Sequence, residues 1–251
     1  MSKVEATKFV MQCQNWFEIV MPIATHKTPA RVILRNGIRF DSGAIYWPDV
    51  WAIFHQGIYT PHYLPIEKND LVVDIGANIG VFTVYAAART QNTVYAIEPF
   101  PSNFACLEHN IHANHLSNTI PLRFAVSDKN GTELLLDAGA SQHHRLNSFV
   151  PDITKKCIEV PSITLQNLMD HYQIKQIDFL KLDCEGAEEA ILLSTPKAYL
   201  QRVRKVAMEF HDQLTRLKHD ELRKLLQEAG FSTEVKLVQG GPLGFLYGWR
   251  E

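Results

Sequence analysis

Several charged side chains lie in and just after one apolar run, and four of them could do acid–base chemistry. The run reads IDFLKL and contains Lys181; Asp183, Glu185 and Glu188 follow it. A charged side chain is costly to bury unless it is paired or used. We therefore expect Lys181 to pair with an acid of this cluster. If the extended backbone continues to residue 185, Lys181, Asp183 and Glu185 share one strand face.

A second apolar run, which reads VRKVAMEFH, ends in Glu209 and His211. If the two runs form neighbouring strands, Glu209 and His211 meet Asp183 at one rim. One hypothesis makes His211 a general base, because an imidazole titrates near neutral pH. Another has Asp183, Glu209 and His211 hold Mg²⁺ or Mn²⁺, which prefer oxygen ligands. In a third, Glu185 and Glu188 only stabilise the start of the next helix, and for Glu188 we prefer this interpretation.

A glycine-containing loop follows an earlier apolar run, in the stretch VVDIGANIG. Asp74 ends the run, and Gly76 and Gly80 flank Asn78. Glycine allows a tight turn and a close approach by a ligand. A dinucleotide-binding loop would read GxGxxG. Because Asn78 and Val81 occupy its second and third glycine positions, the loop argues against a diphosphate ligand.

Polar residues also end the next two apolar runs. Glu98 lies 18 residues beyond Gly80, where an acid is placed to accept hydrogen bonds from both ribose hydroxyls. Ser127 or Asp128, after the third run, could meet an adenine edge. An adenosyl ligand without a diphosphate fits this pattern, and S-adenosylmethionine is such a ligand.

Apolar runs alternate with helical stretches from residue 70 onward, which predicts an α/β fold with a doubly wound, mostly parallel sheet. The runs FSTEVKLV and FLYGWR should close it as an antiparallel hairpin. We divide the chain into an N-terminal extension, 1–66, and a ligand-binding domain, 67–251. In the extension we expect a β-hairpin around Asn36 and Gly37, whose residue types both tolerate positive φ, and a helix in DVWAIFHQGIY.

The first residues of the extension have helical apolar spacing. We interpret them as a packing helix rather than a membrane-contacting one; the spaced residues are Phe9, Val10, Cys13, Trp16, Phe17 and Val20. The extension could act as a lid or an oligomer contact. Tyr59 and His62 could line the cleft with the acceptor, and His143 and His144 lie in a polar insertion that could cover it.

Composition and net charge limit the classes of partner that we expect. The formal net charge is -2 and the pI is about 6.6, so we expect neither nucleic acid nor a membrane as a partner. Four widely spaced cysteines indicate reduced thiols in a cytoplasmic protein. No apolar stretch approaches the roughly 20 residues that span a bilayer, and no signal-peptide cleavage site is evident.

Three stretches carry a family resemblance: DLVVDIGANIGVFTVYAA, YAIEPFPSNFACLEHNI and IDFLKLDCEGAEEAIL. Together they resemble the FkbM family of S-adenosylmethionine-dependent methyltransferases over most of residues 30–235. The resemblance implies a class I, Rossmann-like methyltransferase sheet of seven strands and methyl transfer to a hydroxyl of a small molecule such as a sugar, glycoside or other natural product. It implies cofactor contacts from Asp74, Gly76, Asn78, Gly80, Glu98 and Asp183. The alternatives are a nucleotide-sugar or NAD-binding enzyme, and a non-catalytic binding domain with this fold.

Overall fold

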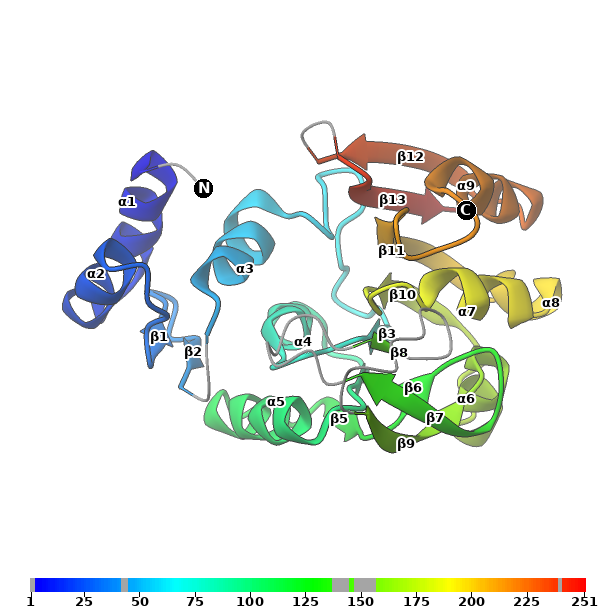
Figure 1. Cartoon of the computed structure of the whole chain (residues 1–251), viewed down its shortest axis with the longest axis horizontal. Helices are drawn as coiled ribbons and strands as arrows, with labels where there is room; N and C mark the ends of the chain where they lie inside the picture. The colour runs from blue at the N-terminus through cyan, green and yellow to red at the C-terminus, as the bar shows by residue number, and fades with distance from the viewer. Residues whose placement is uncertain (1–2, 42–44, 137–144, 147–156, 239–240) are drawn as a thin grey trace.

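The computed structural model describes residues 3–41, 45–136, 145–146, 157–238 and 241–251 (Figure 1). Its centre is a seven-stranded sheet in the order β12-β13-β11-β10-β3-β4-β5. The strands are β3 (Val72–Ile75), β4 (Val94–Ile97), β5 (Thr119–Leu122), β10 (Ile177–Leu182), β11 (Val203–His211), β12 (Ser232–Leu237) and β13 (Leu243–Trp249). β13 is antiparallel to both β11 and β12, and the other pairs are parallel. The predicted doubly wound sheet with an antiparallel closing hairpin is confirmed.

Alternate residues of the sheet pack against helices on opposite faces. Val73 and Leu180 face a core formed with α6 (Leu165–His171), α7 (Glu188–Ser194) and α9 (His219–Glu228), and α8 (Lys197–Leu200) follows α7. Val72 and Phe179 face a core shared with α4 (Val81–Ala87) and the N-terminal segment, and α5 (Pro101–Ala113) packs nearby. The strand order reverses between β10 and β3, so the crevice at their carboxyl ends is where a ligand should bind.

A four-stranded second sheet is inserted after β5. It has the order β6-β9-β7-β8, with β6 (Ala125–Val126), β7 (Gly131–Leu136), β8 (Arg145–Leu146) and β9 (Cys157–Ile163). The third apolar run of the sequence, IPLRFAV, ends just before Ser127. It contributes to two strands and not to one, because β5 pairs with β4 whereas β6 pairs with β9. His143 and His144 lie in this insertion but outside the described residues.

The N-terminal segment contains two helices and a hairpin before the first central strand. α1 (Lys3–Gln12) ends where Cys13 makes a bridge to Leu34, and α2 (Trp16–Ala24) follows. The predicted hairpin is present as β1 (Val32–Ile33) and β2 (Arg39–Phe40). Its turn spans three residues, because Leu34 N donates to Ile38 O, and only Gly37 of the expected pair has a positive φ, of 90°.

Burial of the two N-terminal helices differs from the packing helix that the spacing predicts. Phe9 and Cys13 are buried, but Trp16, Phe17 and Val20 are 54%, 63% and 38% exposed. The break at residues 13–15 resets the helix phase, so α2 turns these side chains outward. Among the described residues, no helix combines the length and apolar character that a bilayer crossing needs.

The predicted helix in DVWAIFHQGIY is present in altered form. α3 (Trp47–Trp51) continues directly as a π-helical turn, η1 (Ala52–Gln56), and Gly57 ends it with a φ of 61°. A π-helical turn adds a residue to the helical repeat and often lies at a functional site. Side chains from this segment and the two helices share a core with the central sheet; the boundary at residue 66 stays a prediction.

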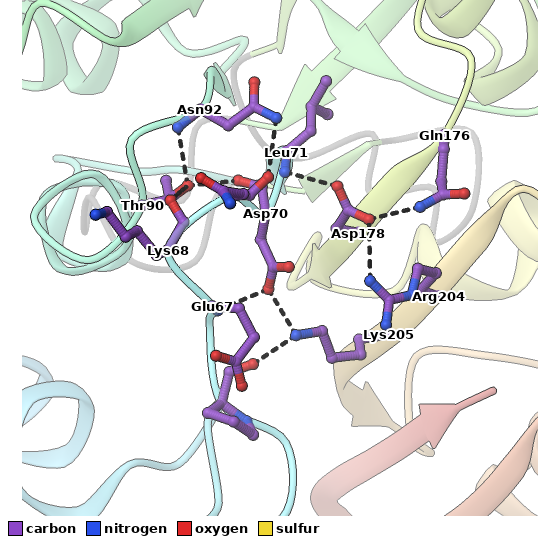
Figure 2. Close-up of polar contacts among 12 residues, drawn as sticks. Glu67, Lys68, Asp70, Leu71, Thr90, Asn92, Gln176, Asp178, Arg204 and Lys205 are labelled. Atoms are coloured by element: carbon purple, nitrogen blue, oxygen red, sulfur yellow. Dashed lines mark hydrogen bonds and ion pairs between the residues drawn. The ribbon is translucent and has the colours of Figure 1, made fainter. Parts of the chain in front are cut away.

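A polar network ties the amino ends of the central strands together (Figure 2). Asp70 Oδ2 lies 2.6 Å from Lys205 Nζ and accepts a hydrogen bond of 2.8 Å from Glu67 N. Lys205 Nζ also donates to Pro65 O at 2.7 Å. Asp178 accepts from Leu71 N at 2.9 Å. The network joins the loop before β3 to β10 and β11.

Replacing Asp70 by alanine should lower the free energy of unfolding by about 3 kcal/mol, because it leaves the largely buried Lys205 ammonium without its carboxylate. Urea denaturation measures the change. Arg204→Ala is the matched control: the Arg204–Asp178 pair is 3.5 Å long and Arg204 is 49% exposed, so it should cost under about 1 kcal/mol. Equal costs for the two variants would contradict this account.

Candidate active site

The loops after β3 and β10 touch at a glycine. Gly76 has a φ of 79°, and a Cβ added there would lie 1.8 Å from the carbonyl oxygen of Asp183. No side chain fits in that space. Gly80 has a φ of 90°, and a Cβ there would lie 2.7 Å from Leu107 Cδ1. The glycines thus allow the loop to turn and to lie directly on the end of β10.

Lys181 is the buried cation of the site. Its Nζ donates to Gly76 O at 2.7 Å and lies 3.1 Å from Asp74 Oδ1 and 3.6 Å from Asp183 Oδ2. Burial lowers the pKa of Lys181, but the Asp74 and Asp183 carboxylates outweigh it and hold that pKa above its ordinary value. The predicted pairing of Lys181 with an acid of the cluster is confirmed.

Asp74 is fully buried. Its other oxygen accepts a 2.6 Å hydrogen bond from the Thr83 hydroxyl. Its structural contacts are thus with the protein itself, through Lys181 and Thr83. The predicted contact of Asp74 with a cofactor stays a prediction, whereas its role in holding Lys181 is visible in the structure.

Tyr59 bridges two carboxylates that come from different strands. Its hydroxyl lies 2.8 Å from Asp183 Oδ2 and 2.9 Å from Glu209 Oε2. A hydroxyl carries one hydrogen and can donate to only one of them at a time. Burial and the two carboxylates raise the pKa of Tyr59 well above its ordinary value, so the phenol keeps its proton.

Glu209 is the carboxyl that supplies the missing proton of this bridge. Burial and the charge of Asp183 raise the pKa of Glu209 to about 8. At neutral pH Glu209 can therefore donate to the Tyr59 oxygen, while Tyr59 donates to Asp183. Asp183, ion-paired with Lys181, is then the charged carboxylate of the bridge.

His211 takes a different position from the one that the spacing suggests. Its Nε2 lies 3.6 Å from Glu185 and its Nδ1 lies 3.5 Å from Glu188, at the outer limit for a hydrogen bond. Burial lowers the pKa of His211, but Glu188, Asp183 and Glu185 outweigh it and raise it to about 10. A protonated imidazole has no lone pair to accept a proton. The raised pKa therefore argues against His211 as a general base near pH 7, and that role stays a prediction.

Glu185 and Glu188, the acids after Asp183, have different positions and contacts. β10 ends at Leu182 and Glu185 has a φ of 53°, so the expectation that Glu185 continues the strand face is wrong. Glu188 begins α7, as expected, and is fully buried. Its two oxygens accept hydrogen bonds from Cys184 N at 2.7 Å and Gly186 N at 2.9 Å, which fixes the loop.

The metal hypothesis finds no support in this geometry. In the part of the chain that the structure describes, no group of three or more His, Cys, Asp or Glu side chains is arranged to hold a metal ion. Asp183 and Glu209 both contact the Tyr59 hydroxyl. The imidazole of His211 lies near Glu185 and Glu188 instead. The proposed Mg²⁺ or Mn²⁺ ligand set of Asp183, Glu209 and His211 is therefore not brought together.

The glycine loop is fixed by Glu98. Its oxygens accept hydrogen bonds from Asn78 N and Phe100 N, each at 2.8 Å. Burial raises the pKa of Glu98 to about 7. Asn78 has a φ of 52°, and its buried Oδ1 has no hydrogen-bond partner among the described residues. An unpaired acceptor in this loop is suited to a donor group on a ligand.

Ser127 and Asp128 lie beyond β6, in the inserted sheet rather than the central one. The fully buried Ser127 hydroxyl is 3.1 Å from Glu133 Oε1 and 3.0 Å from Asp128 Oδ1, and Asp128 is exposed. Contact of either residue with an adenine stays a prediction.

A cavity of about 250 Å³ opens beside these groups. Its lining combines carboxylates, aromatic rings and aliphatic side chains, and includes Tyr46, Asp49, Ile53, Tyr59, Gly76, Asn78, Phe82, Lys181, Asp183, Glu185, Glu209 and Phe245. Tyr59 thus lines the cleft, in agreement with its selection from the sequence. His62 is exposed, packs its ring on Tyr63 and does not line this cavity, so its predicted place in the cleft is wrong.

Asp49 is a cavity residue that sequence reasoning missed. Burial and the charge of Asp183 raise the pKa of Asp49 to about 7, against the effect of Lys181. In the sequence it looks like an acid that stabilises the start of a helix, and it does lie in the first turn of α3. An acid at the start of an otherwise apolar helix was the only signal that could have found it.

Unfolding free energy should fall as the pH rises through the neutral range. Glu209 keeps its proton in the folded state up to about pH 8, against an ordinary pKa of 4.5. The stability that His211 contributes is fully present below its ordinary pKa of 6.5. It is lost as the pH rises through the raised pKa of about 10. In both windows the folded state binds more protons than the unfolded state, so stability declines with pH. In urea titrations Glu209→Gln should make the decline between pH 4.5 and 8 shallower, while Asp49 and Glu98, whose pKa values are raised to about 7, keep part of it. The exposed Glu228→Gln should leave the decline unchanged, and the reverse pattern would refute the assignment.

The strand order, the antiparallel β13 and the glycine loop after β3 define the class I, Rossmann-like methyltransferase fold. The chain belongs to the FkbM methyltransferase family, because the family model described as "Methyltransferase FkbM domain" matches residues 74–233. The resemblance seen in the sequence is confirmed.

Individual relatives agree with this assignment. The chain is 29% identical over 190 residues to 31-O-demethyl-FK506 methyltransferase FkbM of Streptomyces tacrolimicus, which covers 64% of this chain and 72% of the relative. It is 23% identical over 200 residues to Methyltransferase 1 of Beauveria bassiana, 71% of this chain and 78% of the relative. The crystal structure of methyltransferase FkbM from Methylobacillus flagellatus shares the fold, with a TM-score of 0.51 at 13% identity over 98% of this chain and 58% of that one.

Proposed function

We propose that this methyltransferase uses S-adenosylmethionine to methylate a hydroxyl oxygen of a small molecule, such as a sugar, a glycoside or another natural product. The observation that carries the proposal is the cavity in which the glycine loop meets the Asp183–Tyr59–Glu209 bridge. The name of the Streptomyces tacrolimicus relative specifies an oxygen of FK506 as its methylation site, which supports a hydroxyl acceptor here.

The residues around the glycine loop fit S-adenosylmethionine. Gly76 lets the loop lie directly against the backbone of Asp183, and the unpaired Asn78 Oδ1 can accept a hydrogen bond. Glu98 stands at the end of β4, where a ribose diol would bind. These residues would hold the cofactor. Asp74 would contribute indirectly, because it holds Lys181 in place. When bound, S-adenosylmethionine supplies a methyl group that is activated by a sulfonium centre.

The chain's own task is to position the acceptor and take its proton. Asp183 lines the cavity, and Lys181 and Tyr59 fix the position of its carboxylate. We assign the acceptor proton to an Asp183 carboxylate oxygen. Glu209 keeps its own proton and holds Tyr59 in place. Because Tyr59 belongs to the N-terminal extension, this assignment also supports the lid role of the extension.

Thermal denaturation with S-adenosylhomocysteine or NAD tests the cofactor assignment. S-adenosylhomocysteine at about 100 times its Kd should add about 2.7 kcal/mol, which raises Tm by roughly 5–11 °C for a chain of this size. NAD should give no shift. Stabilisation by NAD but not by S-adenosylhomocysteine would exclude the proposal and favour a dinucleotide-binding enzyme.

A further inference from the structure

The outward face of α2 is apolar and uncovered. Trp16, Phe17, Val20 and Met21 follow helical spacing and are 54%, 63%, 38% and 65% exposed. The Trp16 and Phe17 rings pack edge to face, with centroids 6.2 Å apart. A soluble helix usually turns such residues inward. Here only Ile19 of α2 is buried, so this face is an interaction surface.

The helices around this face carry unpaired positive charge. Residues 1–41 hold six Lys or Arg and three Asp or Glu, a surplus of three positive charges in a chain of net charge -2. Glu18 is occupied by Arg31, and Glu5 accepts from Gln56. Lys3, Lys8 and Lys27 are exposed, and no ion pair joins any of them to a carboxylate of the described residues.

The positive charge of this segment and its exposed Trp and Phe side chains together indicate the kind of partner. A two-fold dimer through this face would bring the positively charged N-terminal segments of two copies together, and Glu5 and Glu18 already have partners within the chain. An anionic membrane surface satisfies both features, since Trp and Phe enter the interfacial layer and lysines attract anionic headgroups. We propose that α1 and α2 dock on an anionic lipid surface, with the α2 face in the headgroup region.

This arrangement places the contact away from the proposed site of methyl transfer. α1 and α2 lie at one end of the molecule, whereas β3 and β10, whose carboxyl ends meet at the site, lie near its middle (Figure 1). The expectation of no membrane partner came from the charge of the whole chain. That average does not describe this segment, because residues 1–41 carry a positive surplus and include the exposed rings of α2.

Co-sedimentation with lipid vesicles tests the proposal. The full chain should pellet with vesicles of phosphatidylcholine and phosphatidylserine, pellet weakly with phosphatidylcholine alone, and be released by high salt, which screens the headgroup charge. No sedimentation with the anionic vesicles, or equal sedimentation with both kinds, would overturn the proposal.

Two paired variants test the two features separately. Trp16→Gln with Phe17→Gln should reduce vesicle affinity at least about tenfold, and Lys8→Gln with Lys27→Gln should reduce it about fivefold per lysine. All four side chains are exposed, so the fold should survive. The control is Leu237→Gln with Val238→Gln, which are 55% and 46% exposed at the end of β12; it should bind as the parent chain does.

Analytical ultracentrifugation separates this proposal from a dimer contact. The parent chain and the Trp16→Gln, Phe17→Gln variant should sediment alike without lipid. A concentration-dependent dimer that the variant abolishes would show that a second copy covers the face and would overturn the proposal. Retention of full vesicle binding by this variant would overturn it as well.

Discussion

Replacing Lys181 by methionine should lower the free energy of unfolding by about 3–5 kcal/mol, because it leaves an uncompensated charge in the interior. The charge belongs to Asp74, which is fully buried and whose nearest cation is the Lys181 ammonium 3.1 Å away. The carbonyl oxygen of Gly76 also loses its donor. Methionine fills a similar volume, so the loss measures the charge rather than a cavity. Urea denaturation followed by circular dichroism gives the difference.

Two further variants give this prediction its controls. Adding Asp74→Asn to Lys181→Met should recover part of the loss, because the buried pair is then neutral on both sides. Lys175→Met changes an exposed lysine just before the same strand and should stay within about 0.5 kcal/mol of the parent. A Lys181→Met protein as stable as Lys175→Met would show that the buried ion pair does not stabilise the fold.

Asp183→Asn should lower kcat for methyl transfer by about 10²–10⁴, the contribution of a positioned general base. The amide keeps the size of the side chain but cannot take up the acceptor proton at neutral pH. Stability should change less than in Lys181→Met, because Asp183 has 27% of its side chain exposed and lies farther from the ammonium, at 3.6 Å. Steady-state kinetics on the wild type and the variant measure the effect.

Two companions separate proton transfer from positioning. Tyr59→Phe removes the bridging hydroxyl and leaves both carboxyls, so its kcat should fall less than that of Asp183→Asn. Asp220→Asn, which changes an exposed acid on α9, should leave kcat unchanged. If Asp183→Asn retained full kcat while Tyr59→Phe lost it, Asp183 would not be the base.

The sequence predicted which residues lie together at the carboxyl ends of the central strands. In a parallel sheet the carboxyl ends of neighbouring strands meet at one edge, so Asp183 and Glu209 were expected at one rim if their runs formed neighbouring strands. The pairing of β10 with β11 and the Tyr59 bridge between the two carboxyls confirm this. The pattern succeeded here because strand position alone determines these distances.

The sequence could not predict contacts between residues that lie far apart along the chain. Tyr59 lies 124 residues from Asp183 and 150 from Glu209, and Asp49 enters the cavity through a helix that ends in a π-helical turn. Spacing of two along a strand predicts a shared face for Glu209 and His211. It does not reveal that one meets Tyr59 and the other meets Glu185 and Glu188, because those neighbours belong to other elements.

Isotope-labelled methyl transfer tests the central claim most directly. The protein is incubated with methyl-labelled S-adenosylmethionine and a panel of hydroxylated sugars, glycosides and other natural products, and labelled products are identified by mass spectrometry and NMR. The account predicts label on a hydroxyl oxygen of a small molecule with the wild type and its loss with Asp183→Asn. Label on a nitrogen or carbon atom, or on RNA, or undiminished transfer by Asp183→Asn, would contradict it.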